Sequence, residues 1–140
     1  MQKGIIVSGY FNPLHKGHIE YFKLAKEKVD KLFVIVNNDN QQAIKGSKKF
    51  MLEDERVIII SELRIVDEVF LSIDNDTTVC ETIELVYSKL SSKYKLFFGN
   101  GGDQNNESIP EKHICEKLGI DLVDGLGNKI QSSSWLIGNK

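Results

Sequence analysis

The sequence of 140 residues predicts a single α/β domain, residues 1–140, with about five parallel strands in one doubly wound sheet and helices on both faces. Two observations predict this fold class. Short apolar runs typical of buried strands alternate along the chain with segments whose apolar residues recur at helical spacing. No internal repeat, low-complexity linker or break in composition divides the chain, so one domain accounts for all of it.

The opening third of the chain predicts a strand, a helix and a second strand. Residues 4–8 form a compact β-branched run that ends at Gly9, and residues 32–36 form a second apolar run. Between these runs, from His18 onward, the apolar residues at helical spacing are Ile19, Phe22, Ala25 and Val29. Strand, helix and strand in this order favour a right-handed parallel βαβ unit.

The rest of the chain continues the alternation. We expect a helix that opens with residues 52–56, a strand over 66–73, a helix capped by Thr77 or Thr78 and ending at Leu90, a strand over 95–98, a helix from Pro110 to Gly119 and a strand over 120–123. The three unusual loops, 9–18, 37–49 and 99–109, each follow a predicted strand. Because the carboxyl ends of parallel strands share one edge of the sheet, these loops should gather there and form one site.

Composition and charge exclude several functions. The net charge is −2 and the pI is about 5.9, so no overall positive field favours nucleic acid or an anionic membrane. The cysteines, Cys80 and Cys115, form neither a disulfide framework nor a zinc motif, which is typical of a reducing compartment. The apolar run at the N-terminus is too short for a signal peptide or a membrane span. We therefore expect a cytoplasmic protein.

The loop after the first strand carries the strongest chemical signal. His15 and His18 stand three residues apart around Gly17, where a strand passes into a helix. A helix N-terminus favours phosphate through its backbone N–H groups and its dipole, and two imidazoles there add directed donors. The competing interpretation is a polar turn with two surface histidines, which an H-x-G-H pattern by itself does not exclude.

The stretch G-Y-F-N-P-L-H-K-G-H over residues 9–18 resembles the signature of the nucleotidyltransferase superfamily with the H-x-G-H motif, in its cytidylyltransferase-like branch (glycerol-3-phosphate cytidylyltransferase and the heptose-phosphate nucleotidyltransferases). The resemblance implies a Rossmann-like fold in which His15 and His18 are catalytic, contacting the nucleotide phosphates and stabilising the transition state. It also implies nucleotide binding by the residues before them: Gly9, Tyr10, Phe11 and Asn12. Where Asn12 stands the cytidylyltransferases usually carry Asp, and Asn-Pro is instead similar to the nicotinamide-mononucleotide adenylyltransferases.

A basic loop, K-G-S-K-K over residues 45–49, is similar in position to the family's flexible lysine that reaches the phosphates. The resemblance implies Lys45 as the catalytic lysine, with Lys48 as the second choice and a substrate-binding residue. Arg64 lies in a stretch similar to a cytidylyltransferase Arg-x-Val-Asp-x-Val segment and is expected to bind substrate. Asp39 is expected to shape the nucleotide pocket. Without the resemblance, these residues are interpreted as solvated loops and an ordinary cation at a helix C-terminus.

Two later motifs complete the predicted nucleotide site. Glycines permit close backbone approach to a base or ribose, and Gly102 followed by Asp103 is similar to a motif of the cytidylyl and heptose-phosphate branches. The stretch K-I-Q-S-S-S is similar to the family's C-terminal Ile-Ser-Ser/Thr-Ser/Thr element, which holds the triphosphate. It implies nucleotide binding by Lys129, Ser132, Ser133 and Ser134. The family usually has isoleucine where Gln131 stands and an arginine a few residues upstream of this element, where this chain has none.

Together these residues predict an enzyme, a nucleotidyltransferase that moves a nucleoside monophosphate from CTP or ATP to a small phosphate monoester and releases pyrophosphate. Because a monoester is largely ionised at neutral pH, the attacking oxygen needs no general base, and the protein supplies positioning and charge stabilisation. Mg²⁺ is expected to come with the triphosphate rather than to occupy a metal site of the protein. The family also implies a homodimer.

Three other interpretations stay open from the sequence. One is an adenylyltransferase of the nicotinamide-mononucleotide or phosphopantetheine type. Another is a non-catalytic nucleotide-binding regulator, which the absent arginine favours. The third is a flavodoxin-like binding module of another kind, in which the histidines have no catalytic role.

Overall fold

The computed structural model describes residues 1–46, 48, 50–101 and 109–126, and in that part strands and helices alternate along the chain. The strands are β1 (Gln2–Gly9), β2 (Lys31–Val36), β3 (Glu68–Leu71), β4 (Tyr94–Gly101) and β5 (Asp121–Leu126). The helices are α1 (Lys16–Lys26), α2 (Asp39–Lys45), α3 (Glu53–Ser61), α4 (Cys80–Leu90) and α5 (Lys112–Leu118). Each of the first four strands is thus followed by at least one helix.

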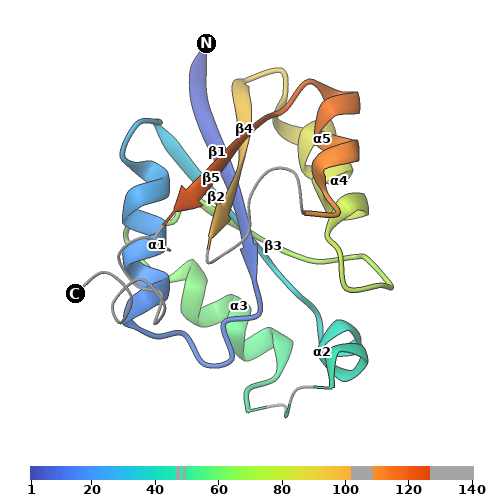
Figure 1. The fold of residues 1–140 in the computed structure, drawn as a ribbon. Coiled ribbons are helices and arrows are strands. Elements are labelled where there is room, and N and C mark those ends of the chain that lie inside the picture. Colours follow the sequence, from blue (N-terminus) through green and yellow to red (C-terminus); the bar gives the residue numbers. More distant parts are fainter. Residues whose placement is uncertain (47, 49, 102–108, 127–140) are drawn as a thin grey trace, which may run out of the picture.

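The strands form one parallel sheet in the order β3-β2-β1-β4-β5. The chain builds outward from β1 through β2 to β3, then crosses to the other side of β1 for β4 and β5 (Figure 1). The predicted doubly wound, Rossmann-like sheet is therefore confirmed. The strand order reverses between β1 and β4, and ligands of open α/β sheets bind outside the carboxyl ends of the strands at such a switch point.

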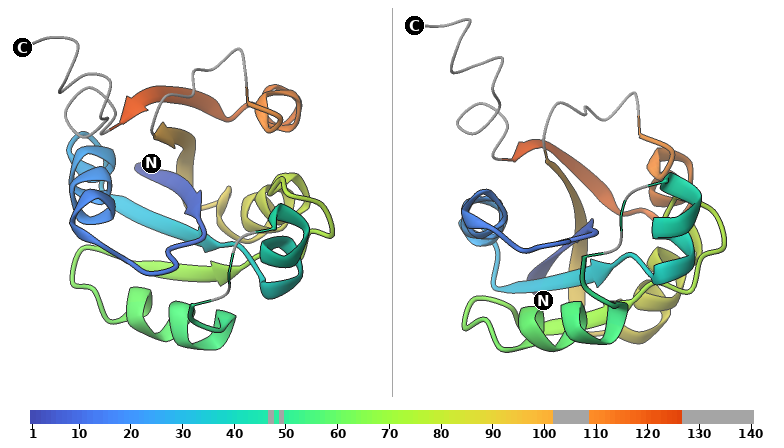
Figure 2. Two further views of the ribbon diagram at one scale, coloured as in Figure 1. Left: turned by 60° about the horizontal axis from the view of Figure 1, so that its bottom comes forward. Right: turned by 90° about the horizontal axis from the view of Figure 1, so that it is seen from below.

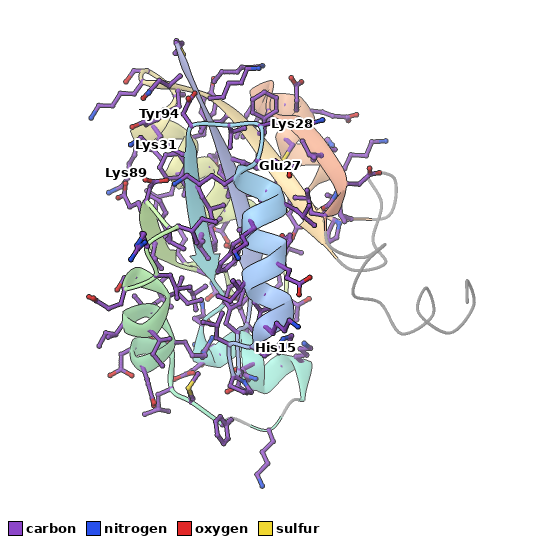
Figure 3. All side chains as sticks on the ribbon, turned by 90° about the vertical axis from the view of Figure 1, so that its left-hand side faces the viewer. His15, Glu27, Lys28, Lys31, Lys89 and Tyr94 are labelled. Atoms are coloured by element: carbon purple, nitrogen blue, oxygen red, sulfur yellow. The ribbon has the colours of Figure 1, made fainter. Side chains whose placement is uncertain are left out.

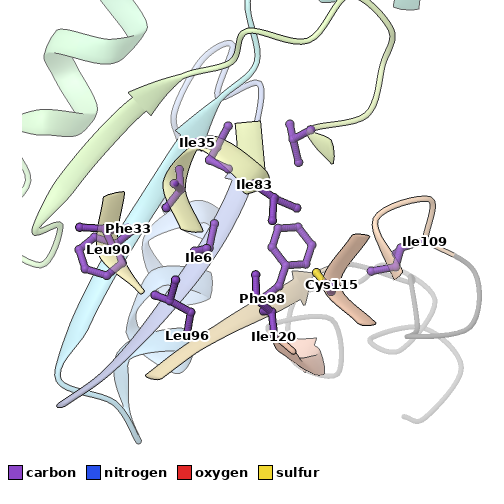
Figure 4. Packing of buried hydrophobic residues seen from close by; sticks show 12 residues of the cluster. Ile6, Phe33, Ile35, Ile83, Leu90, Leu96, Phe98, Ile109, Cys115 and Ile120 are labelled. Atoms are coloured by element: carbon purple, nitrogen blue, oxygen red, sulfur yellow. The ribbon is translucent and has the colours of Figure 1, made fainter. Parts of the chain in front are cut away.

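Alternating side chains of the strands supply two hydrophobic cores, one on each face of the sheet. In β1, Ile6 belongs to one core, whereas Ile5 and Val7 belong to the other. The first core lies against α4 and α5, and Figure 4 shows it from close by. The second core lies against α1 and α3, which contribute Phe22 and Ile60. Helices therefore cover both faces, as the sequence predicts and as the views of Figure 2 show.

One helix is absent from the sequence prediction. α2 occupies most of the stretch predicted as a loop after the second strand, so that prediction is wrong for these residues. The side chains that α2 buries are Gln41 and Gln42, and its Ile44 is 58% exposed, so the segment has no apolar periodicity. Only its ends carried a signal: Asn38 and Gln41 form a capping box, and Gly46 ends the helix with φ of 83°.

The start of α4 also differs from the prediction. Its N-cap is Val79, without a side-chain cap bond, rather than Thr77 or Thr78. Thr78 accepts only a long hydrogen bond, 3.4 Å, from the backbone N–H of Cys80. The buried carboxylate of Asp74 instead accepts from two backbone N–H groups of the first turn, at 2.8 and 3.0 Å. An acid from the preceding loop therefore does what a capping threonine was predicted to do.

The other predicted elements are present with shifted ends. The strand β3 covers 4 residues of the predicted stretch 66–73. β3 is an edge strand, and Ser72 and Asp74 after it belong to a buried polar turn rather than to the strand. Among the residues that the structure describes, no helix is both long enough and apolar enough to cross a membrane.

Candidate active site

The loop that contains both predicted histidines lies at the switch point of the sheet. β1 ends at Gly9 and α1 begins at Lys16, so residues 10–15 lead from the carboxyl end of the central strand into the helix. Farther along α1, the hydroxyl of Tyr21 donates to the carbonyl of Gly99 in β4 at 3.1 Å. This bond ties α1 across the boundary between β1 and β4, where a ligand crevice is expected.

His15 and His18 cap the start of α1 reciprocally. Nδ1 of His15 accepts from the backbone N–H of Gly17, and Nδ1 of His18 accepts from the backbone N–H of His15, both at 3.1 Å. The two rings stack with their centroids 3.9 Å apart. A neutral imidazole that accepts at Nδ1 carries its proton on Nε2. The pair therefore presents two Nε2–H donors, each on the side of its ring opposite the backbone bond.

The surroundings of His18 favour its neutral form. The ring of Phe11 meets the His18 ring edge-on, with centroids 4.9 Å apart, and Phe22 packs against Phe11. Burial, and to a smaller extent the neighbouring His15, lowers the pKa of His18 from 6.5 to about 4. At neutral pH His18 is consequently an uncharged hydrogen-bond donor.

Two glycines allow these rings to lie so close to the backbone. Phe11 has a positive φ of 53°, and its buried ring lies over Gly9, where a Cβ would come within 2.7 Å of it. At Gly17, a Cβ would lie 2.9 Å from Cε1 of His15. Carbon atoms do not approach so closely without strain. Gly9 and Phe11, predicted to bind nucleotide, thus support the ring of His18 from the core side.

The predicted lysine reaches the first motif from the end of α2. Nζ of Lys45 lies 4.3 Å from the centroid of the Tyr10 ring, within the range of a cation–π interaction. The hydroxyl of Tyr10 is buried without a hydrogen-bond partner among the described residues, and burial raises its pKa. Lys45 therefore contacts the first motif through the ring face of Tyr10.

A residue that the sequence analysis did not assign, Arg56 of α3, ties the loops of this edge together. Its guanidinium is fully buried and donates to the carbonyls of Tyr10 at 2.8 Å and Asn37 at 2.7 Å, and its Nε donates to the carbonyl of Met51 at 3.1 Å. Its Nη2 pairs with the carboxylate of Asp39 at 2.9 Å. One side chain thus holds the loop after β1, the end of β2 and the segments before α2 and α3.

The sequence did contain a signal for Arg56. It falls four residues before Ile60 and seven before Leu63, on the apolar stripe of α3, where a charged side chain is expected only if it is paired. Its partner Asp39, predicted to shape the nucleotide pocket, has one carboxylate oxygen on the guanidinium. The backbone N–H of Asp39 donates to Glu53 at 2.8 Å, so this residue joins the starts of α2 and α3.

Two predicted substrate-binding residues lie at opposite ends of the sheet. Lys48 lies beside the first motif, because its carbonyl accepts from the side chain of Asn12 at 2.9 Å. Arg64 lies between α3 and β3, at the amino ends of the strands. The 11 residues of α1 span about 16 Å between these ends, and Figure 3 shows His15 at one end of this helix and Lys31 near the other. Within one chain, Arg64 is therefore not brought to the histidines.

The second half of the predicted nucleotide site lies outside the described residues: Gly102, Asp103, Lys129, Ser132, Ser133 and Ser134. In the part of the chain that the structure does describe, no group of three or more His, Cys, Asp or Glu side chains could hold a metal ion.

Comparison with known proteins covers nearly the whole chain. The model of the cytidylyltransferase-like family matches residues 6–133. The FAD synthase of Picrophilus torridus is 32% identical over 135 residues, which cover 93% of this chain and 90% of that protein. The FAD synthase of Thermococcus sibiricus is 36% identical over 118 residues, 84% of this chain and 74% of that protein. The bifunctional protein HldE of Syntrophotalea carbinolica is 32% identical over 128 residues, 86% of this chain but only 24% of that longer protein.

Solved structures show the same fold. The lipopolysaccharide core biosynthesis protein of Thermoplasma volcanium has a TM-score of 0.66 and 25% identity, covering 89% of this chain and 96% of that one. A bifunctional NMN adenylyltransferase/ADP ribose pyrophosphatase of Francisella tularensis has a TM-score of 0.61 at 14% identity, and the match covers 89% of this chain and 37% of that one. The range matched by the family model includes both histidines and Lys45.

Proposed function

This chain belongs to the cytidylyltransferase-like family and is a nucleotidyltransferase, and from that premise we propose that it transfers the adenylyl group of ATP to a small phosphate monoester. ATP is favoured because two relatives of similar length are named FAD synthases, and FAD contains an AMP half. Transfer from CTP is the second candidate, because the stretch that ends at Asp103 is similar to the cytidylyl branch.

The main support for a catalytic role of the first motif is the pair of Nε2–H donors. Both imidazoles use Nδ1 for a backbone N–H, which directs both Nε2–H groups away from the protein backbone at the start of a helix. The same two bonds also cap the helix, so the support for catalysis lies in the Nε2–H groups that these bonds leave for a ligand. Hydrogen-bond donors next to a helix N-terminus suit phosphate oxygens.

In the proposed reaction, an ionised oxygen of the acceptor phosphate attacks the α-phosphorus of the triphosphate. The new P–O bond forms as the bond from the α-phosphorus to the bridging oxygen breaks, and pyrophosphate leaves with that electron pair. The second pKa of a phosphate monoester is about 6, so the protein need not remove a proton at neutral pH. His15 and His18 donate to phosphate oxygens as charge builds on them, and Lys45 adds a positive charge.

Mg²⁺ enters this scheme as part of the substrate, bound to the triphosphate oxygens, whose charge it neutralises. We propose that the base, ribose and remaining phosphates bind the six predicted residues from Gly102 to Ser134. We also propose a homodimer in the cytoplasm. The free thiols of Cys80 and Cys115 agree with a reducing compartment.

The test is a product assay. The purified protein is incubated with Mg²⁺, either ATP or CTP, and a panel of monoesters that includes FMN, sugar 1-phosphates, glycerol 3-phosphate, nicotinamide mononucleotide and phosphopantetheine. We expect pyrophosphate release with ATP and one class of acceptor, together with the matching adenylylated product in the mass spectrum. Release with CTP alone would establish the second candidate. Nucleotide binding in a thermal-shift assay without release for any pair would contradict an enzymatic role and support a regulator.

A further inference from the structure

The side chain of Asn12 binds protein backbone at both ends of its amide. Nδ2 donates to the carbonyl of Lys48 at 2.9 Å. Oδ1 accepts from the backbone N–H of Phe50 at 3.0 Å and from that of Met51 at 2.7 Å. An asparagine side chain can make four hydrogen bonds, and three of them are spent on residues 36 to 39 positions later in the chain.

These bonds join the histidine motif to what we call the lysine segment, whose described residues are Lys45, Gly46, Lys48, Phe50 and Met51. Asn12 stands three residues before His15, and Lys48 three residues after Lys45. A second residue joins the same two segments, because buried Arg56 donates to the carbonyls of both Tyr10 and Met51. The segment is thus held by the half-buried amide of Asn12 and by the buried guanidinium of Arg56.

We propose that Asn12 is a positioning residue that holds the lysine segment beside the histidine pair, so that both act on the same triphosphate. The triphosphate in this proposal rests on the proposed function. The hydrogen bonds by which Asn12 holds the lysine segment, which we call the clamp, do not depend on it. The clamp gives Asn12 a role different from the direct nucleotide contact that the family resemblance implies. In this proposal Asn12 acts through its contacts with Lys48, Phe50 and Met51, while Lys45 of the same segment lies on the ring of Tyr10.

The chemistry of the clamp requires an amide. An aspartate would still accept from Phe50 and Met51, but it has no donor for the Lys48 carbonyl, and its second oxygen would face that carbonyl oxygen. The bond to the Lys48 carbonyl therefore explains why asparagine, rather than the aspartate usual in cytidylyltransferases, suits position 12 of this chain. The isosteric change Asn12→Asp removes one contact and adds a repulsion without changing the shape of the side chain.

The test compares Asn12→Asp and Asn12→Ala with Asn40→Asp, which adds the same charge at an exposed residue of α2. Amide hydrogen exchange at Phe50 and Met51 is measured together with kcat and KM for the triphosphate. In Asn12→Ala we expect exchange at both amides to rise about tenfold, because each loses its acceptor. In Asn12→Asp, which keeps that acceptor, we expect kcat to fall about tenfold with a smaller change in KM, and Asn40→Asp should match the unsubstituted protein.

The outcomes separate the clamp from the function. Unchanged exchange in Asn12→Ala would overturn the clamp whatever the activity. A rise in KM without a fall in kcat would assign Asn12 to nucleotide binding instead. If the unsubstituted protein transfers no nucleotide at all, the proposed function fails, while the exchange data still decide whether Asn12 holds the segment.

Discussion

The two ends of the parallel sheet are held by different kinds of charged contact. At the carboxyl end, the guanidinium of Arg56 is fully buried and binds three backbone carbonyls and one carboxylate. At the amino end, the carboxylate of Asp67 accepts from the backbone N–H of Leu32 at 2.8 Å and pairs with Lys26 at 3.0 Å and Lys31 at 3.8 Å. The side chains of these three charged residues are 25 to 37% exposed.

The difference follows from what each end has to hold. The amino end joins helix and strand termini, and several water-screened pairs share that task, each contributing about 1 kcal/mol or less. The carboxyl end has to fix the loop after β1, the end of β2 and the segments before α2 and α3. The buried guanidinium of Arg56 holds these segments by hydrogen bonds. Its removal would leave carbonyls such as that of Asn37 without this donor. The functional end should therefore be the end less tolerant of substitution.

The largest effect is expected from Arg56→Met, which keeps an unbranched side chain but removes every donor. We expect the free energy of unfolding to fall by about 3–5 kcal/mol, because three backbone carbonyls and the Asp39 carboxylate lose their donor. The matched change at the amino end, Asp67→Asn, should cost about 1 kcal/mol or less. Urea unfolding of both variants provides the measurement. Equal losses would show that the two ends do not differ in the way described.

The next largest effect is expected on catalysis rather than on stability. His18→Ala removes one Nε2–H donor, and kcat should fall by at least about a hundredfold. The control is His113→Ala, at an exposed histidine of α5 on the amino-terminal half of that helix. Steady-state rates of pyrophosphate release give the comparison. Full activity in His18→Ala would favour a binding module in which the motif has no catalytic role.

A pH-dependent change in stability is expected from the same histidine. Because the pKa of His18 is lowered from 6.5 to about 4 in the folded chain, the unfolded chain binds its proton first as the pH falls. The contribution of His18 to stability is therefore complete above pH 6.5 and is lost progressively between that pH and about 4. Urea unfolding across this range should show the loss, and His18→Asn, which does not titrate, should lack that part of it. Parallel curves for the two proteins would contradict the lowered pKa.

The smallest effect is expected from Arg64→Ala. Arg64 is exposed at the amino end of the sheet, so kcat/KM should change by less than about twofold if each chain forms its own site. The same rates with ATP and the identified acceptor check this. A tenfold or larger loss would show that Arg64 does bind substrate, as the family resemblance implies, and in a homodimer it could then serve the site of a second copy.

Much of this fold could be predicted because burial leaves a local trace in the sequence. β1 and β2 are covered on both faces, so residues 5–7 and 32–36 are continuous apolar runs. The histidine motif could be found because a strand, two imidazoles around a glycine and a helix follow one another directly. α2 could not be found in this way, since it buries glutamines and exposes an isoleucine.

The sequence by itself determined the alternation of strands and helices, the position of the first motif at the end of β1 and the membership of the family. Each depends on residues close together in the chain. Only the tertiary structure decided that Asn12 binds the lysine segment, that Arg56 is a buried hub and that Arg64 lies at the far end of the sheet. These contacts join residues up to 46 positions apart. Such partners come together only when the strands are assembled in the sheet, so a local sequence pattern cannot predict them.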